Sequence, residues 1–405
     1  MSPAPSDETL ADLILERLDT LLDTLDRQIG AQLVAILHHP SFRALERRWR
    51  ALKWLVDRVD FRENLKVAIL TCSLEDLERD LSDRPLTDSG LFEWIYRAEL
   101  SRPAGSPYGA VLADLEFGPE HAPLLERAAR LFGVAQAPFI AAAAPALFDG
   151  RTLEALRRRA DACMLGLTVQ WFRVRSSYSI VSDTLHYDES VEPGRASLAA
   201  PAVYLIGACI ADSFARYRWC PNIVGPSGGG LVPNAELVDP LAPERLAALD
   251  ELGCITLAPR ENAAGERGAC VVAAPSLRAP RSFPATEEGA AAALNFDLAS
   301  RLPYQFMATR IAHYLFAMYF TRDPAWDPGT TEQELNDWIG QYVADRDVTS
   351  SAVRSRRPLR KAEVRLVDSA HEDEWLLLEA WLRPHMKANG AFFTLKIDGK
   401  LERDG

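Results

Sequence analysis

The sequence predicts a mixed α/β protein with an N-terminal helical hairpin, an α/β domain and a C-terminal domain of helices followed by strands. Three observations predict it. Apolar residues first recur at helical spacing, over about 11–59. Short apolar runs of strand length then alternate with helical patterns as far as residue 274. The chain ends in three strand-like segments without an intervening helix, over 362–367, 375–382 and 391–397.

The first helical pattern covers 11–37 and carries a regular apolar seam. Leucine or isoleucine occupies positions 15, 18, 22, 25 and 29, a 4-3 spacing typical of coiled coils, and such a seam requires a partner surface. His38, His39 and Pro40 end this pattern, and Ser41 is a candidate cap for a second helix that runs to about Val59. We expect residues 1–60 to form a helical hairpin.

An α/β domain is predicted over 61–285. Residues 65–72 form an apolar run of strand length, and Ser73 to Asp76 then has the S-x-x-D form of a capping box. A stretch rich in Pro, Arg and Ser over 275–284 ends the domain. Its further predicted helices cover 90–100, 120–131 and 200–217, and its further predicted strands cover 109–117, 138–144, 219–224, 254–258 and 269–274.

The remaining residues, 286–405, are predicted to form a domain of their own. A long helical pattern covers 287–320, and Pro303 is expected to kink or split it because proline removes a backbone donor. A shorter helix is predicted over 331–344. We interpret the three terminal strands as a meander or as strands awaiting partners.

Composition excludes several classes of protein. A formal net charge of −12 argues against a general binder of nucleic acid or anionic membranes, which needs a basic face. The six cysteines lack C-x-x-C spacing and are interpreted as small buried apolar residues. Because the N-terminus lacks a signal-peptide pattern and no run of about 18 apolar residues occurs, we expect a cytoplasmic protein without membrane insertion.

One motif suggests enzyme chemistry. Gly225 to Gly229 has the G-x-S-x-G form of a hydrolase nucleophile elbow and follows a predicted strand. An elbow requires a helix directly after the serine, whereas the residues from Leu231 onward are a poor helix start. We favour a tight glycine turn and keep a serine hydrolase acting through Ser227 as an alternative. The downstream histidines available as its base are His313, His371 and His385.

Neither a cofactor nor a metal is predicted. The glycines of this motif lack the lysine and hydroxyl of a phosphate-binding loop. The histidines lack a cysteine or carboxylate at ligand spacing, so we expect structural roles for them. We therefore predict no catalytic residue, no cofactor-binding residue and no metal ligand.

A dense basic cluster precedes the first terminal strand. It could bind nucleic acid, but the acidic chain and the lack of interleaved aromatic residues favour ion pairs with acidic protein surfaces. This pattern indicates assembly. The cluster consists of Arg354, Arg356, Arg357, Arg360 and Lys361.

Ordered blocks of residues carry a resemblance to a known family. They are Ile36 to Pro40 with Trp49 and Leu52, Asp60 to Asn64, Ala137 to Ala143, Asp212 to Pro226, Arg310 to Leu315, Arg356 to Arg360 and Leu382 to His385. In this order, from about Leu13 to Leu401, the chain resembles the large subunit of the contractile sheath of bacterial type VI secretion systems.

The resemblance implies a structural protein with a contractile-tail-sheath-like fold, and not an enzyme. It implies a heterodimer with a small sheath subunit, which polymerises as a helical tube around an inner-tube protein above a baseplate. Contraction then drives the inner tube and its effectors outward by rigid-body repacking, without a nucleotide in this chain. The glycine turn would be structural, and the terminal strands would be exchanged between neighbouring protomers.

Two departures from the family leave an alternative open. Only Met1 to Leu10 precede the first helix, where family members carry an arm that donates a strand, and the segment between Leu147 and Cys163 is short. The alternative is a paralogue that caps a sheath, or an adaptor that binds sheath subunits without polymerising.

Two surfaces are predicted to serve assembly. The helix over 331–344 is predicted to face the inner tube through Glu332, Glu334, Asp337 and Trp338. Contacts between sheath subunits are predicted for Arg356, Arg357, Arg360, Arg383 and His385.

Overall fold

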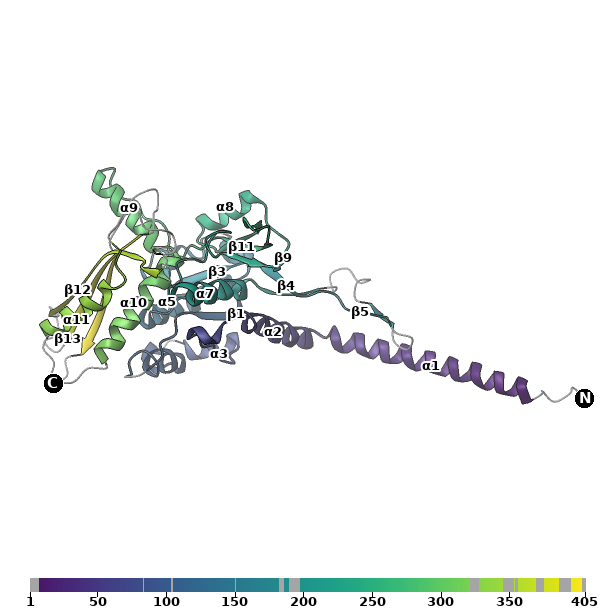
Figure 1. The fold of residues 1–405 in the computed structure, drawn as a ribbon. Helices are drawn as coiled ribbons and strands as arrows, with labels where there is room; N and C mark the ends of the chain where they lie inside the picture. Colours follow the sequence, from purple (N-terminus) through teal and green to yellow (C-terminus); the bar gives the residue numbers. More distant parts are fainter. Residues whose placement is uncertain are drawn as a thin grey trace, which may run out of the picture. The chain divides into compact units, whose positions relative to one another are not determined.

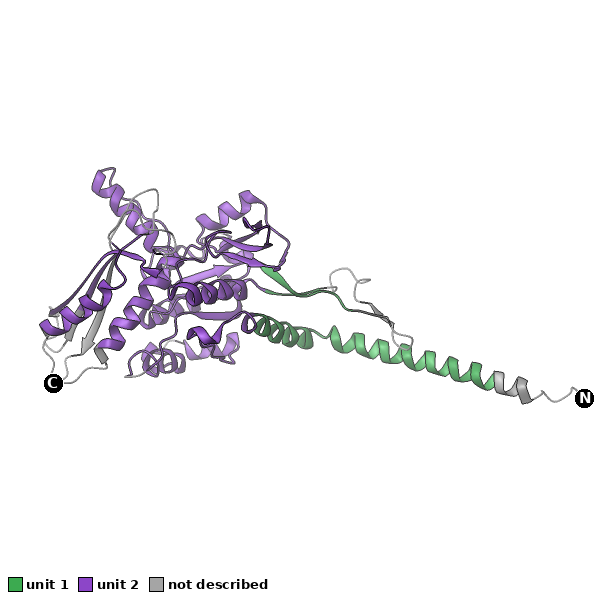
Figure 2. Cartoon of the chain, viewed as in Figure 1, with its two compact units in different colours: residues 1–54, 171–200 green, residues 55–170, 201–405 purple. Residues whose placement is uncertain are grey.

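The computed structural model has the mixed order of helices and strands that the sequence predicts (Figure 1). The chain divides into two compact units, residues 1–54 with 171–200 and residues 55–170 with 201–405 (Figure 2). The mixed α/β fold class is thereby confirmed. The residues that the structure describes are 7–82, 84–102, 105–149, 151–181, 186–188, 197–320, 328–344, 353, 356–368, 375–385 and 395–402.

The first unit combines two helices with short strands. Strand β4 lies beside β7, and β5 pairs with β6 in an antiparallel hairpin. Helix α1 contacts β6. The elements of this unit are α1 (Asp7–Leu37), α2 (Pro40–Val56, whose end enters the second unit), β4 (Trp171–Arg175), β5 (Ser179–Val181), β6 (His186–Asp188) and β7 (Leu198–Pro201).

The two N-terminal helices do not form the predicted hairpin. The His38 N–H donates to the carbonyl four residues earlier at 3.0 Å, and the His39 carbonyl accepts from the Arg43 N–H at 3.0 Å. Helical hydrogen bonding therefore continues through the joint, and α2 follows α1 in nearly the same direction (Figure 1). Pro40 begins α2, where its missing N–H is not needed, so Ser41 lies inside the helix and is not its cap.

Helix α2 is held to β4 within the first unit. The Arg175 Nε lies 3.0 Å from Glu46 Oε1, and both side chains are largely buried. The guanidinium of Arg47 lies 5.2 Å from the centre of the Trp171 ring. These contacts fix which face of α2 is turned toward the sheet.

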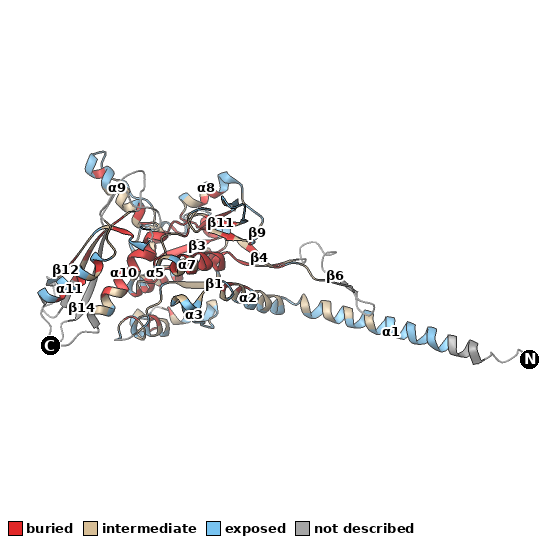
Figure 3. Ribbon diagram, viewed as in Figure 1, coloured by how far each residue is buried: buried red, intermediate tan, exposed pale blue. Residues whose placement is uncertain are grey.

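The α/β part of the second unit is built on a parallel sheet with β2 between β1 and β3. Every residue of β2 is buried, and α5 and α7 pack on the sheet (Figure 3). A second sheet is antiparallel, with β11 between β10 and β8. The elements of this part are α3 (Leu74–Asp80), α4 (Gly90–Phe92), β1 (Val111–Phe117), α5 (Ala122–Ala135), β2 (Phe139–Ala143), α6 (Glu154–Arg157), β3 (Leu165–Thr168), α7 (Val203–Tyr217), β8 (Leu231–Pro233), β9 (Leu237–Val238), α8 (Pro243–Glu251), β10 (Thr256–Glu261) and β11 (Arg267–Ala273).

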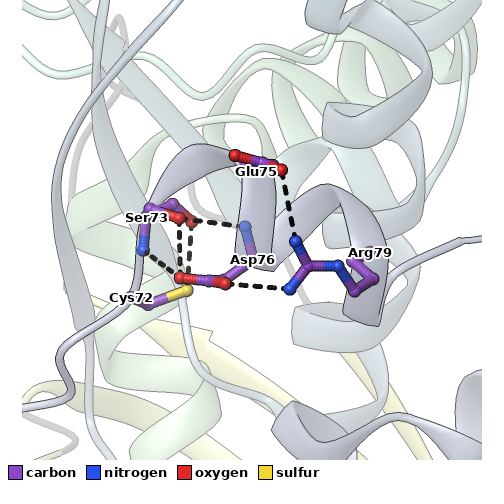
Figure 4. A network of polar contacts seen from close by, with 5 residues as sticks. All are labelled: Cys72, Ser73, Glu75, Asp76 and Arg79. Carbon is purple, nitrogen blue, oxygen red and sulfur yellow. Dashed lines mark hydrogen bonds and ion pairs between the residues drawn. The ribbon is translucent and has the colours of Figure 1, made fainter.

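The predicted capping box at the start of α3 is confirmed (Figure 4). The Asp76 N–H donates to Ser73 Oγ at 3.1 Å, and the Ser73 N–H donates to Asp76 Oδ2 at 3.1 Å. Arg79 lies 3.2 Å from both Asp76 and Glu75. The hydrogen bonds from Ser73 lower the pKa of the Asp76 carboxyl. The network therefore satisfies backbone donors that a helix start leaves unpaired.

Two of the predicted strands are absent. Residues 65–72 lie outside every sheet of the described chain, because no neighbouring strand is available to pair with them. Residues 219–224 also lie outside the sheets. This segment is held in place by the buried Trp219. The Nε1–H of Trp219 donates to the Arg356 carbonyl at 3.3 Å, and its ring centre lies 5.0 Å from that of Tyr342. Side-chain insertion into the C-terminal core thus replaces strand pairing.

The C-terminal part has helices packed against an antiparallel meander, which is one of the two arrangements predicted for the terminal strands. Pro303 is the second residue of α10, so the long helical pattern splits before it. The strand order is β12-β13-β14. Among the helices of the described residues, none combines the length and the apolar character needed to cross a bilayer. The elements are α9 (Glu287–Ala299), α10 (Leu302–Phe320), α11 (Pro328–Gly340), β12 (Leu359–Asp368), β13 (Trp375–Pro384) and β14 (Leu395–Glu402).

Candidate assembly surfaces

The glycines of the G-x-S-x-G motif form a tight turn. Gly225 and Gly229 have φ angles of +79° and +85°, in the left-handed region that favours glycine. A Cβ atom on Gly229 would lie 2.2 Å from the Asn222 carbonyl oxygen. The Gly230 N–H closes the turn by donating to the Gly225 carbonyl at 2.9 Å. The backbone of the turn itself therefore requires glycine.

This turn is fastened to strand β11. The Gly225 N–H donates to the Val271 carbonyl at 2.8 Å, and the Val271 N–H donates to the Gly230 carbonyl at 2.9 Å. The turn thus continues the ladder that β8 makes with β11, which gives the glycines a structural role.

Ser227 lacks the surroundings of a catalytic serine in the described part of the chain. Its side chain is exposed, and β8 follows where an elbow would have a helix. His313 is buried, and its Nε2 lies 3.2 Å from the Ala135 carbonyl oxygen. Burial lowers the pKa of His313 to about 4. His371 falls outside the described residues, and His385 directly follows β13.

The cysteines are free thiols, and the most buried of them serve as small apolar residues. Cys209, Cys254 and Cys270 are buried, and burial raises the pKa of Cys254 to about 12 and that of Cys270 to about 11. They stay protonated at neutral pH. No cluster of three or more His, Cys, Asp or Glu side chains able to hold a metal ion occurs in the part of the chain that the structure describes.

Helix α11 covers the outer edge of β12 with polar side chains. The Asn336 Nδ2 donates to the Val364 carbonyl at 2.7 Å, and its Oδ1 accepts from the Val364 N–H at 2.8 Å. The Glu332 Oε2 accepts from the Leu366 N–H at 2.9 Å. Side chains therefore take the place of a neighbouring strand along this edge.

The start of the same edge is closed by the chain that follows α11. The Ala344 N–H donates to the Leu359 carbonyl at 2.9 Å, and the Leu359 N–H donates to the Tyr342 carbonyl at 3.2 Å. At the other end of the sheet, β14 has β13 as its only strand neighbour among the described residues. The meander thus has one edge closed by α11 and the chain after it, and one edge at which no second strand pairs among the described residues.

The predicted inner-tube helix corresponds to α11, and Glu332 and Trp338 contact other parts of the chain. Glu332 holds β12, as described above. Trp338 packs its ring against those of Tyr314 at 5.5 Å and Tyr342 at 5.1 Å. Glu334 and Asp337 are exposed. These two carboxylates belong to the solvent-exposed surface of α11.

The predicted basic surface is brought together by the pairing of β12 with β13. The His385 N–H donates to the Pro358 carbonyl at 2.8 Å, so the end of β13 lies beside the start of β12. Arg356 and Arg357 are exposed, and Arg360 is partly buried. Arg354 falls outside the described residues.

Arg383 belongs to a solvent-facing hollow on the outer side of the meander. The guanidinium of Arg365 lies 4.9 Å from the centre of the Trp381 ring in this hollow. Alternation of charged residues at 361, 363 and 365 is the sequence signal that could have revealed it. The residues that line it are Lys361, Glu363, Arg365, Trp381 and Arg383.

Both parts of the chain match models of one family. Residues 19–161 and 151–241 match the EvpB/VC_A0108 tail sheath N-terminal domain. Residues 291–401 match the EvpB/VC_A0108 tail sheath gpW/gp25-like domain. The chain belongs to the EvpB/VC_A0108 tail sheath family. It is a structural subunit of the tail sheath type, as the sequence predicted, and the second matched domain contains α10, α11 and the meander.

A relative supports the same assignment for this sheath protein. The type VI secretion system sheath protein TssC1 of Pseudomonas aeruginosa is 28% identical over 433 aligned residues. The alignment covers 96% of this chain and 86% of the relative. The predicted resemblance to a large sheath subunit of type VI secretion is therefore confirmed.

The sheath protein exposes much apolar surface on its first two helices. Twelve of the nineteen large apolar side chains that are exposed in the described part of the chain lie on α1 and α2. Exposed apolar surface of this extent marks a site of protein–protein interaction. The twelve are Leu13, Ile14, Leu15, Leu18, Leu21, Leu22, Leu25, Ile29 and Ile36 on α1, and Phe42, Leu45 and Trp49 on α2.

A second apolar surface lies in the segment 65–72, which the sequence predicted as a strand. Val67, Ile69 and Leu70 are 38%, 63% and 52% exposed. By contrast, the edge strand β1 has an irregular register between Ala113 and Glu116, a feature that discourages strand addition. The segment 65–72 of the sheath protein carries no such protection.

Proposed function

We propose that this chain is the large subunit of a contractile sheath of the type VI kind. It pairs with a small sheath subunit in the bacterial cytoplasm, and the heterodimers polymerise as a helical tube around an inner tube. Contraction of the tube above a baseplate drives the inner tube and its effectors outward. The observation that carries the proposal is the match to both tail sheath domains, over 19–241 and 291–401.

The exposed surfaces support a role in assembly. The seam of α1, the outward face of α2 and the segment 65–72 leave large apolar side chains in water, which a stable single subunit avoids. Burial of such side chains stabilises an interface by roughly 25 cal/mol per Å² of apolar surface. In the assembled tube these surfaces are covered by other subunits.

The C-terminal meander suits linkage by strand addition. Its β12 edge is closed by Asn336, Glu332 and the chain after α11, whereas β14 has no second strand neighbour among the described residues. A strand from a neighbouring protomer therefore adds beside β14, and main-chain hydrogen bonds give the link its strength.

The basic and acidic surfaces supply electrostatic contacts in this assembly. Arg356, Arg357, Arg360, Arg383 and His385 contact acidic surfaces of neighbouring sheath subunits, and Glu334 and Asp337 on α11 face the inner tube. Exposed charged groups of this kind set orientation and association rate more than affinity. The contraction step is a rigid-body repacking of these interfaces.

The experiment that tests the function is co-expression of this chain with its small sheath subunit, followed by negative-stain electron microscopy. Long tubes are the expected result. Discrete heterodimers that never polymerise would contradict a lattice role and establish an adaptor or cap. Failure of the two chains to co-purify would contradict the pairing itself.

A further inference from the structure

Helix α1 combines an apolar seam with a stripe of acidic residues. Leu15, Leu18, Leu22 and Leu25 of the seam are 58%, 49%, 55% and 52% exposed. The helix contains seven acidic and two basic residues. At 3.6 residues per turn the acidic residues fall along one flank of the seam. Those whose exposure is described on this flank are Glu16, Asp19, Asp23 and Asp26.

Helix α2 has the complementary character. Phe42, Leu45 and Trp49 lie on one face and are 37%, 54% and 62% exposed. The helix contains five basic residues and one acidic residue. Arg48 is exposed and adjoins this face. Tryptophan and arginine are the residues that most often dominate the energy of an interface.

The two helices of one chain cannot meet face to face. Helical hydrogen bonds pass through the joint at His38 and His39, so folding α1 back onto its own α2 would break them. The opposite face of α2 carries Ala51, which is fully buried, and Arg47, whose guanidinium lies over the Trp171 ring of β4, so the Phe42–Trp49 face is left outward. The hairpin β5–β6 contacts α1 in the same unit, but the seam from Leu15 to Leu25 remains exposed.

Like charge opposes the symmetric alternatives. Two α1 helices would bring two acidic stripes together, and two α2 helices would bring two basic faces together, which disfavours both pairings. A pairing of α1 with α2 from a different copy joins apolar surface to apolar surface and acidic flank to basic residue. This pairing between copies also leaves the helical hydrogen bonds at His38 and His39 intact.

We infer that α1 of one copy packs on the Phe42, Leu45 and Trp49 face of α2 of another copy, with Arg48 facing the acidic stripe. The interface joins two different surfaces of the same chain, so it is heterologous and links successive copies head to tail, in rings or in open helical arrays. The inference rests on the proposed sheath function, because it assigns a lattice contact between neighbouring large subunits.

The test is site-specific photo-crosslinking in the co-expressed complex with the small subunit. Benzoylphenylalanine replaces Leu22 on the seam, and in a matched control it replaces the exposed Thr24 on the opposite face. Mixing isotope-labelled and unlabelled copies distinguishes contacts between copies from contacts within one copy. The expected product joins position 22 of one copy to residues 42–49 of another, at a yield at least about tenfold above the Thr24 control.

Charge variants provide a second measurement. The double variant Asp19→Lys with Asp23→Lys is expected to lower tube yield about tenfold, and adding Arg48→Glu to it is expected to restore most of the yield. A charge reversal outside α1 and α2, Arg151→Glu, is the control and is expected to leave the tube yield unchanged.

The outcomes separate this inference from the proposed function. If tubes form but position 22 crosslinks to the small subunit, or to α1 of another copy, the inference is wrong and the sheath function stands. Lack of rescue by Arg48→Glu in folded, heterodimer-forming protein also overturns it. If neither tubes nor heterodimers form, both proposals fail together.

Discussion

The side-chain amide of Asn336 pairs with both main-chain groups of Val364, at 2.7 Å to the carbonyl and 2.8 Å to the N–H. A helix thereby occupies the position of a fourth strand beside β12. The arrangement needs both an acceptor and a donor on one short side chain, which asparagine provides.

Replacement of Asn336 by alanine is expected to destabilise the C-terminal domain by about 1–3 kcal/mol. The reason is that two half-buried main-chain groups of Val364 lose their partners. Urea unfolding and hydrogen exchange at the Val364 amide measure the effect. The control is Gln333→Ala at an exposed position of the same helix, and equal stability of the two variants would contradict the role assigned to Asn336.

Alanine scanning of the glycine turn is expected to give graded effects. Gly229→Ala places a Cβ 2.2 Å from the Asn222 carbonyl oxygen at a φ of +85°, and should destabilise by roughly 3 kcal/mol or more. Gly225→Ala meets no atom within 4 Å and should lose about 1 kcal/mol through its positive φ alone. Thermal unfolding distinguishes the two.

Ser227→Ala serves as the control for that series and addresses the hydrolase alternative. The Ser227 side chain is exposed, so we expect unchanged stability and unchanged sheath assembly. A fluorophosphonate probe should leave Ser227 unlabelled. Selective labelling of Ser227 would instead establish an activated serine.

Stability is expected to fall in acid because of His313. Its pKa in the folded chain is about 4, below the ordinary value of 6.5. Between these values the unfolded chain binds a proton that the folded chain does not, so stability is lost as pH falls. The loss between about pH 7.5 and pH 5 amounts to roughly 2 kcal/mol.

The matching variant is His313→Gln, whose amide can donate to the Ala135 carbonyl without ionising. Unfolding measured at both pH values should show a smaller pH dependence for this variant than for the unchanged chain. An identical dependence in both proteins would place the acid sensitivity at another group.

The segment 65–72 is expected to gain protection when the small subunit binds. Its amides belong to no strand ladder in the described chain, and Val67, Ile69 and Leu70 are exposed. Amide hydrogen exchange should therefore be fast in the free chain and slow in the complex. Ala68→Pro removes one main-chain donor and should lower recovery of the complex about tenfold.

The control for that variant is Ala263→Pro, which lies at the second position of a turn closed by the Gly265 N–H and the Asn262 carbonyl at 3.0 Å. Proline is favoured there, so complex formation should be unaffected. Fast exchange of 65–72 in an intact complex would remove this segment from the interface.

Reversal of the two exposed carboxylates of α11 tests the inner-tube surface. Glu334→Lys with Asp337→Lys should weaken co-assembly with the inner-tube protein by several-fold and increase its dependence on salt. Glu287→Lys on α9 is the matched control. Unchanged tube binding would assign these carboxylates to another contact or to solvent.

Features with a local cause were predictable from the sequence. The capping box needs only Ser73 and Asp76, three residues apart, and the break before Pro303 needs only one missing donor. The blocks that resemble a sheath subunit also lie in contiguous stretches, so the family could be recognised before the fold was known.

Features that depend on distant partners could not be predicted in the same way. Asn336 meets Val364 across 28 residues, and nothing in its local pattern indicates a strand edge. The runs 219–224 and 65–72 have strand-like composition, but strand formation requires a neighbouring strand, and neither run has one among the described residues. The joint after Leu37 keeps its hydrogen bonds because Pro40 begins a helix as readily as it ends one.

The closed edge of β12 limits the number of further strands that the C-terminal sheet can accept. With Asn336 and Glu332 occupying one side, the proposed strand addition has one site among the described strands of this sheet, beside β14. Each subunit would then donate one strand and accept one strand, so strand addition alone cannot produce a branched array. These strand links alone would join the proposed protomers into unbranched rows, so a helical tube depends on its other interfaces to hold the rows together.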